Sequence, residues 1–419
     1  TTGIGTFDGG VQVGSAATIH SNGNLGLTGI ITATNFKTGD SNVHNTGYNV
    51  GTGASIHSNG NAALAGIVTA NGGVVVGAAA TIFANGNIAA AGIVTAATFV
   101  PTVGQLSDRN VIINGDMRIA QRYTSTTSIN EYIVDRWRSY GGALGATWSQ
   151  QTDATAYPRS RYALRQHRTA SDSQTNNTGV GQGIETKNSL QLAGETVTLS
   201  FKARCGANFS ASSNYLTSRI NGGEGTDENP FGMTNTNGDS QNNTLTTSVQ
   251  SFTHTWTIPS DKTQVTVLFD YTPVGTAGAN DWFEIAEVQL EVGSVATPFE
   301  FRNYGDELAR CQRYFQLLGA SQGTYDAMST GSCASATAAY VPYRLITTMR
   351  ATPTFSLAGS ASDFRYTRGG DQTPSNIALD QAGQNMVAVT VTVSSCTADN
   401  ATRLFNVNTT GGLQFIAEL

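Results

Sequence analysis

The sequence predicts an all-β protein: a repetitive β stalk, a jelly-roll sandwich and a small C-terminal β-sandwich, with one short linking helix. Charged residues are 12% of the 419 residues, about half the usual share, and there are 47 glycines. Runs of alternating apolar and polar residues, such as 197–201 and 265–269, are typical of strands. Similar segments also recur near the start of the chain. We therefore expect three regions, at residues 1–106, 107–303 and 304–419.

The stalk is predicted from three copies of a short motif. The sequence reads HSNGN at residues 20–24 and 57–61 and FANGN at residues 83–87. Each copy is followed by Gly-Ile, a branched residue, Thr and Ala. Asn-Gly is the strongest short signal for a hairpin turn, because both turn residues take positive φ. We expect a short strand on each side of the turn and a third strand at the Gly-Ile run.

One repeat has too few large apolar side chains to form a core alone, since alanine and glycine fill much of it. Three chains wound about one axis would bury Ile19, Ile56 and Ile82 together, which predicts a homotrimer. The alternative is a flexible linker rich in glycine, alanine and asparagine. The fixed register of the isoleucines, Asn-Gly and Gly-Ile favours the stalk.

Residues 107–303 are predicted to form a two-sheet sandwich of jelly-roll type, because short alternating strands are separated by polar loops. A long polar loop is expected at residues 221–243. Three of the four tryptophans are expected in the core: Trp137, Trp256 and Trp282. Trp148 stands between Thr147 and Ser149, so we expect an exposed ring that stacks on the apolar face of a sugar.

The linking helix is predicted to begin at Asp306, whose side chain fits the N-cap position. Four apolar residues fall near one face of this helix: Leu308, Cys311, Phe315 and Leu318. That face packs on its own chain or meets its symmetry mates, and the second arrangement is favoured.

The last hundred residues or so are long enough for one small sandwich, with strands expected at residues 387–393 and 413–419. Tyr325, Tyr366 and Arg368 lie in polar, glycine-flanked stretches of this region. Binding residues concentrate in loops, so these three side chains are candidates for glycan contacts.

Two stretches of the middle region resemble a phage tail-fibre domain that is similar to carbohydrate-binding jelly rolls. The first is NVIINGDMRIAQR at residues 110–122, followed by Asp-Arg-Trp at 135–137. The second is VQLEVGSVATPFEFR at residues 288–302, which runs into YGDELARCQRYF at 304–315. The repeats resemble fibre shaft repeats, and Met-Arg-Ala-Thr-Pro with the terminal Ala-Glu-Leu resembles the distal domain of such fibres.

The resemblance also implies a structural Ca²⁺ ion where the two ends of the jelly roll meet. Asp116 and Glu287 would supply two oxygen ligands there. Calcium takes about six to eight oxygens, and the sequence indicates no third ligand. No other cofactor is expected.

Several classes of function are excluded or disfavoured by composition and motifs. The net charge of −6 and the absence of a basic cluster argue against nucleic acid, and no apolar run is long enough for membrane insertion. No nucleophile, phosphate-binding or metal motif occurs, so an enzyme is not expected. The acid pairs Asp227/Glu228 and Glu284/Glu287 keep glycoside hydrolysis open as an alternative. All four cysteines are expected as buried free thiols: Cys205, Cys311, Cys333 and Cys396.

Together these features predict a homotrimeric phage tail fibre, a structural and adhesive protein of the virion. Its N-terminus would join other tail proteins, and its far end would bind polysaccharide or lipopolysaccharide on the host surface. Alternatives are a fibre or spike that hydrolyses glycans, or a fibre of a contractile injection system or capsid.

Overall fold

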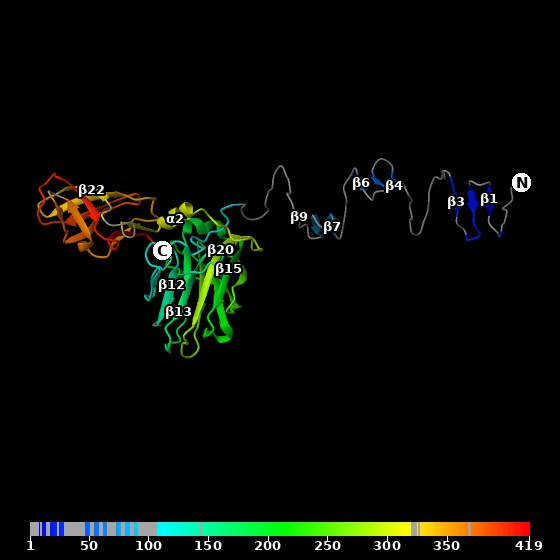
Figure 1. The fold of residues 1–419 in the computed structure, drawn as a ribbon, viewed down its shortest axis with the longest axis horizontal. Coiled ribbons are helices and arrows are strands. Elements are labelled where there is room, and N and C mark those ends of the chain that lie inside the picture. The colour runs from blue at the N-terminus through cyan, green and yellow to red at the C-terminus, as the bar shows by residue number, and fades with distance from the viewer. Residues whose placement is uncertain are drawn as a thin grey trace. The chain divides into compact units, whose positions relative to one another are not determined.

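A computed structural model describes residues 8, 11–13, 17–22, 25–28, 47–50, 54–57, 62–64, 73–76, 80–83, 88–90, 107–142, 145–319, 325, 327–367 and 370–419. The chain divides into two compact units, Thr1–Phe99 and Val100–Leu419. Strands dominate the described part of both units, which confirms the predicted all-β class (Figure 1).

The N-terminal unit contains three small antiparallel sheets within its described residues, one for each repeat. The sheets are β1 (Val11–Val13), β2 (Ala17–Ile19) and β3 (Leu25–Leu27); β4 (Gly47–Val50), β5 (Ala54–His57) and β6 (Ala62–Leu64); and β7 (Gly73–Val76), β8 (Ala80–Phe83) and β9 (Ile88–Ala90).

The hairpin predicted at each Asn-Gly is confirmed by the pairing register. Ile19 pairs with Leu25, Ile56 with Ala62 and Ile82 with Ile88, so all three copies use the same offset. The third strand of each sheet precedes the hairpin, where the sequence analysis expected none. The strands expected at the Gly-Ile runs lie outside the described residues.

The middle sandwich has the two antiparallel sheets expected of a jelly roll. One sheet has the order β10 (Ser125–Thr126), β12 (Ala146–Thr152), β13 (Tyr162–Arg168), β20 (Trp282–Val292), β15 (Thr196–Cys205) and β18 (Gln250–Thr257). The other has the order β11 (Arg138–Gly141), β14 (Thr178–Ile184), β19 (Gln264–Tyr271), β16 (Tyr215–Gly223) and β17 (Asn237–Thr244).

One large hydrophobic core fills the space between these two sheets. The rings of Phe201 and Phe269 meet edge-on there at 4.7 Å, and Trp137 lies beside Phe269. The predicted strands at 197–201 and 265–269 are therefore confirmed. The loop expected at 221–243 is wrong in part, because its last residues form β17, which pairs along β16.

Short helical turns complete this sandwich. They are α1 (Thr186–Ser189), η1 (Leu190–Leu192) and η2 (Ser212–Asn214).

The two stretches that resemble a tail-fibre domain lie side by side in the fold. The Val111 amide donates to Leu290 O at 3.0 Å, and the Val288 amide donates to Gly115 O at 2.9 Å. A Cβ on Gly115 would lie 2.1 Å from Val288 O, so only glycine allows this approach. The two stretches therefore join the first and last segments of the sandwich and close it.

The linking helix is α2 (Tyr304–Gln312), and it begins after Asn303 rather than at Asp306. Cys311 and the following Tyr314 pack against Ile113 and Ile119, so the helix contacts its own chain rather than needing symmetry mates. Phe315 and Leu318, which were expected on the helix, belong to a strand instead. Among the described residues no helix is long and apolar enough to cross a membrane.

The C-terminal sandwich packs a three-stranded sheet on a seven-stranded one. The first has the order β21 (Phe315–Leu318), β30 (Gly412–Ile416) and β24 (Thr354–Ala358). The second has the order β26 (Asp371–Gln372), β25 (Phe364–Thr367), β29 (Ala401–Asn406), β22 (Ala327–Cys333), β23 (Ala338–Arg344), β28 (Met386–Thr392) and β27 (Asn376–Ala382). The short turn η3 (Ala361–Asp363) precedes β25. The strands predicted near 387–393 and 413–419 correspond to β28 and β30.

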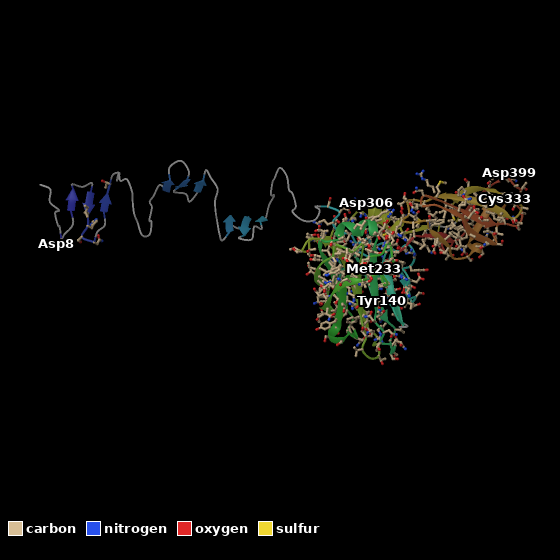
Figure 2. The ribbon with its side chains drawn as sticks, turned by 180° about the vertical axis from the view of Figure 1, so that it is seen from behind. Asp8, Tyr140, Met233, Asp306, Cys333 and Asp399 are labelled. Carbon is tan, nitrogen blue, oxygen red and sulfur yellow. A yellow bond between two sulfur atoms is a disulfide. The ribbon has the colours of Figure 1, made fainter. Side chains whose placement is uncertain are left out.

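Cysteine usage differs from the expectation. Cys333, which is labelled in Figure 2, forms a disulfide with Cys396 in the C-terminal sandwich. Cys205 and Cys311 are buried free thiols. The prediction of four free thiols is therefore wrong for one pair.

Buried and partly buried ion pairs join the two sandwiches within the second unit. Glu418, near the chain end, accepts hydrogen bonds from Arg122 at 3.0 Å and from the buried Arg136. Arg313 pairs with Glu185 at 2.6 Å, and Arg350 pairs with Asp227 at 2.8 Å. The two sandwiches keep separate hydrophobic cores.

Candidate functional site

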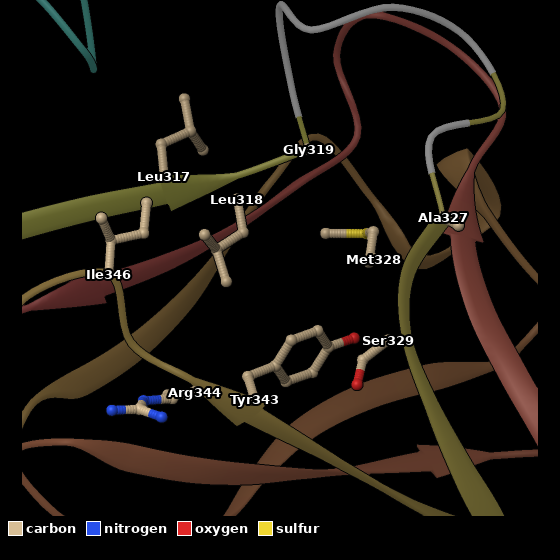
Figure 3. A pocket seen from close by; sticks show the side chains of 9 residues that line it. All are labelled: Leu317, Leu318, Gly319, Ala327, Met328, Ser329, Tyr343, Arg344 and Ile346. Carbon is tan, nitrogen blue, oxygen red and sulfur yellow. The ribbon is translucent and has the colours of Figure 1, made fainter.

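A pocket of about 550 Å³ opens on the C-terminal sandwich (Figure 3). It lies where β21, β22 and β23 come together with the segment that follows β23. Its described lining residues are Leu317, Leu318, Gly319, Ala327, Met328, Ser329, Tyr343, Arg344 and Ile346. The volume falls within the roughly 300–1,000 Å³ usual for small-ligand sites.

The backbone of the pocket wall requires a glycine. Gly319 has φ +97°, a region that side chains rarely adopt, and an added Cβ would lie 2.9 Å from the Met328 methyl. Glycine at this position lets the chain leave β21 while Met328 keeps its place in the pocket.

The period of two along β23 gives the pocket its mixed chemistry. Tyr343 points inward and is 4% exposed, whereas the next residue, Arg344, is exposed. In Figure 3 the Tyr343 ring extends toward Ser329 and Met328, and the Arg344 guanidinium points the other way. Ile346, which is 59% exposed, adds an apolar surface.

Two polar groups of the pocket lack protein partners. Within the described part of the chain the buried Tyr343 hydroxyl has no hydrogen-bond partner, and burial raises the pKa of this phenol. Within the described residues, the Arg344 side chain has no ion pair or hydrogen bond, whereas its backbone pairs with Met386 in the sheet. Ser329 Oγ donates to Pro342 O at 2.6 Å, which leaves its lone pairs free to accept. A buried hydroxyl without a partner is costly, so a ligand with hydroxyl groups would satisfy it.

Trp148 does not have the exposed ring that the sequence suggested. It is fully buried in the jelly-roll core, and its indole N–H donates to Gly179 O at 3.3 Å. Its neighbours Thr147 and Ser149 are polar because consecutive strand residues point to opposite faces. The expected stacking position is therefore wrong.

The three residues of the C-terminal region that were predicted to contact glycans differ in their exposure. Tyr366 is 1% exposed in β25, and its hydroxyl accepts from the Ser394 amide at 3.4 Å, so its ring cannot stack on a ligand. Tyr325 is 67% exposed, and its ring centre lies 6.1 Å from that of Phe405. Arg368 lies outside the described residues. Of these three, only Tyr325 is described as exposed.

Asp116 and Glu287 do not fit a calcium site. The ends of the sandwich meet as expected, but Asp116 pairs with Arg118 at 3.0 Å and Glu287 pairs with Lys202 at 2.8 Å. Each carboxylate thus has a cationic partner, whereas Ca²⁺ needs about six to eight oxygens. No group of three or more His, Cys, Asp or Glu side chains that could hold a metal occurs in the described part of the chain.

The carboxylates considered for glycoside hydrolysis form ion pairs and hydrogen bonds with other protein groups. Glu284 is fully buried and accepts from Arg165 at 2.5 Å and from Arg204 at 2.6 Å. Burial opposes the ionisation of Asp227, but the Thr186 amide and the Arg350 guanidinium keep the pKa of this carboxyl below its usual range. Hydrogen bonds from Thr234 lower the pKa of Glu228. A general acid needs a raised pKa, so these groups are poorly suited to the role.

Trp282 differs from its expected core position. It lies in β20 outside the hydrophobic core, and the guanidinium groups of Arg165 and Arg204 lie 4.1 and 5.6 Å from its ring centre. Trp137 is buried and Trp256 packs against the core, as predicted.

Sequence reasoning missed the pocket residues Met328, Tyr343, Arg344 and Ile346. The alternation at residues 340–344 was the available signal, since it separates inward from outward positions on a strand. The contribution of β21 and β22 to the same pocket depends on tertiary structure and has no local signal.

Comparisons with known proteins give no family: no protein-family model matches the chain. No curated protein matches it either.

Several solved structures are similar at low scores. The enzymatically active domain of tailspike protein 4 from bacteriophage CBA120 has 11% identity and a TM-score of 0.30, over 44% of this chain and 21% of that one. A CBM4 structure has 20% identity and a TM-score of 0.27, over 43% and 98% of the two chains. The CBM22-2 xylan-binding domain from Paenibacillus barcinonensis has 13% identity and a TM-score of 0.25, over 38% and 92%. This chain spans about a fifth of the tailspike domain, and at such TM-scores the similarities support no functional argument.

Proposed function

We propose that the chain binds glycans of a host cell surface as the adhesive part of a phage tail fibre. The observation that supports this most directly is the pocket of the C-terminal sandwich. A sugar ring has an apolar face and a rim of hydroxyls, so it needs apolar side chains beside unsatisfied polar groups. Leu318, Met328 and Ile346 supply the first, and the Tyr343 hydroxyl, which has no partner among the described residues, supplies the second.

The fibre role rests on the repeats and on the two motifs that frame the jelly roll. In this proposal three chains associate through the N-terminal unit, whose far end joins other tail proteins of the virion. Three pockets on one fibre raise the avidity for a dense glycan surface without requiring a tight single contact.

The proposed activity is binding without catalysis. Each carboxylate of the candidate acid pairs already forms an ion pair with a protein side chain or accepts a hydrogen bond from one. Incubation of the intact protein with host polysaccharide should therefore leave the chain length unchanged. Shortened chains would instead favour the hydrolytic alternative.

The binding proposal is tested by applying the intact protein to a glycan array and to host cells. Ile346→Glu places a charge on the apolar wall of the pocket, at a position exposed enough to leave folding intact. Binding should fall at least tenfold. Val295→Glu is the matched control, because Val295 is 75% exposed and lies outside the pocket lining. Equal binding by both variants would remove the pocket from the proposal.

A further inference from the structure

The rim of the C-terminal pocket carries a cationic side chain that has no ion pair among the described residues, in a protein of opposite net charge. Arg344 is the charged side chain among the described lining residues, and the whole chain has a net charge of −6. Many arginines in the described part of the second unit pair with a carboxylate, as Arg136, Arg168 and Arg313 do. An exposed guanidinium without such a partner at a pocket rim is available to a ligand.

The guanidinium group selects the kind of ligand that this rim can hold. Its planar N–H groups match the two oxygens of a carboxylate or phosphate, and such charge-assisted bonds are about twice as strong as neutral ones. An anion bound at this rim would therefore gain a charge-assisted contact with Arg344.

The second polar group lies on the other side of the pocket. The Tyr343 hydroxyl is buried and has no partner among the residues that the structure describes, and its ring points away from the Arg344 guanidinium. Leu318 and Met328 line the same pocket with apolar surface. A ligand that satisfies the whole pocket must carry hydroxyls, an apolar ring face and one anionic group.

We infer that the pocket binds an anionic sugar, one whose ring carries a carboxylate or a phosphate, with Arg344 holding the charge and Tyr343 bonding a ring hydroxyl. The inference rests on the proposed glycan binding and adds the class of sugar. It also assigns the specificity to Arg344, which the sequence analysis did not select.

The experiment applies the intact protein to an array of three matched sets of oligosaccharides. One set carries uronic or sialic acids, the second carries the same sugars after reduction of the carboxyl group, and the third carries sugar phosphates. Members of the first or third set should bind at least tenfold more tightly than the reduced set. The two charged sets distinguish a carboxylate ligand from a phosphate ligand.

Two variants then test the assigned residues. Arg344→Ala should lose at least tenfold in affinity for the anionic sugars and little for neutral ones. Lys187→Ala, which removes the same charge from an exposed site on α1, should change neither. Tyr343→Phe should weaken binding while leaving the free protein at least as stable, because the hydroxyl has no partner to lose.

The outcomes separate this inference from the proposed function. Equal binding of reduced and anionic sugars, or full binding by Arg344→Ala, would overturn the anionic class and leave glycan binding standing. Failure of every glycan on the array would overturn both. Loss of stability in Tyr343→Phe would show that its hydroxyl has a structural partner and is not held for a ligand.

Discussion

The two compact units treat apolar and charged side chains in opposite ways. In Thr1–Phe99, Ile19 stands in a three-residue strand and leaves 48% of its surface exposed. In Val100–Leu419, Arg168 and Glu284 are fully buried and Arg136 is 1% exposed. Ile19 of the first unit is thus an exposed apolar side chain, whereas the second unit buries charges that a fold normally exposes.

The difference shows how each unit is stabilised. A sheet of three short strands has little apolar surface to offset its ordering entropy, and the proposed trimer would add the burial that such a sheet lacks. Each sandwich of the second unit has its own hydrophobic core. Such a fold can also bury charged side chains if each one has a partner of opposite charge, because an unpaired buried ion is very costly. Arg168 illustrates the rule, since it donates to Asp281 and to four other oxygens.

The largest expected effect concerns assembly through the N-terminal unit. Sedimentation equilibrium of the intact protein should give three times the mass of the chain. Ile19→Asp should weaken this assembly, because it would place three charges together at the expected contact. Val274→Asp changes a residue that is 61% exposed in the second unit and serves as the control. A single-chain mass for the unmodified protein at micromolar concentration would contradict the trimer.

The next effect concerns the buried charges between the two sandwiches. Glu418→Ala leaves the guanidinium groups of Arg122 and Arg136 buried without their carboxylate. The free energy of unfolding of the second unit should fall by about 3–5 kcal/mol, as for other broken buried pairs.

Denaturant titration measures this loss, and Glu195→Ala is the control because it removes an exposed carboxylate. The control should change stability by no more than about 0.5 kcal/mol. Similar losses in the two variants would show that the Glu418 pairs contribute little.

The third effect concerns the covalent closure of the C-terminal sandwich. Replacing both Cys333 and Cys396 by serine removes a disulfide that spans 63 residues. Stability should fall by about 3 kcal/mol, chiefly because the unfolded chain regains freedom. A reducing agent should cause a similar loss in the unmodified protein and none in the double variant. Unchanged stability in both tests would show that the bridge is not formed in solution.

The fold was largely predictable from local patterns, because strands and hairpins leave local signals. The Asn-Gly turns and the alternation at 197–201 and 265–269 correspond to elements of the structure. The polar strand β17 was missed because its exposed residues show no alternation, and its pairing with β16 supplies the order instead.

The candidate site was less predictable, because exposure depends on which strand face meets a core. Trp148 was judged by its polar neighbours, yet those neighbours point to the other face of β12. The disulfide also had no local signal, since Cys333 and Cys396 meet only when the fold brings their Cα atoms to 5.7 Å. Tyr343 and Arg344 required knowledge of the pocket that they line.

The smallest expected effect concerns Asp116, a buried carboxylate whose hydrogen bonding is incomplete. Asp116 is 4% exposed, and one of its carboxylate oxygens has no hydrogen-bond partner. Burial raises its pKa to about 6, with a further contribution from Glu307, although the Arg118 guanidinium opposes the shift. The ionised form is therefore disfavoured in the folded protein.

The raised pKa fixes the sign of the pH dependence. The folded protein binds this proton more tightly than the unfolded chain, whose ordinary value is 3.8. The favourable contribution is present at low pH and is lost as the pH rises to about 6. Asp116→Asn removes the titration, so its stability relative to the unmodified protein should rise by roughly 2–3 kcal/mol between about pH 4 and pH 7.

Asp306→Asn removes the same charge from an exposed position on α2 and controls for net charge. A difference between Asp116→Asn and the unmodified protein that is constant over this range would show that Asp116 is solvated. In that case the burial of charged side chains in the second unit would be limited to those that have a partner of opposite charge.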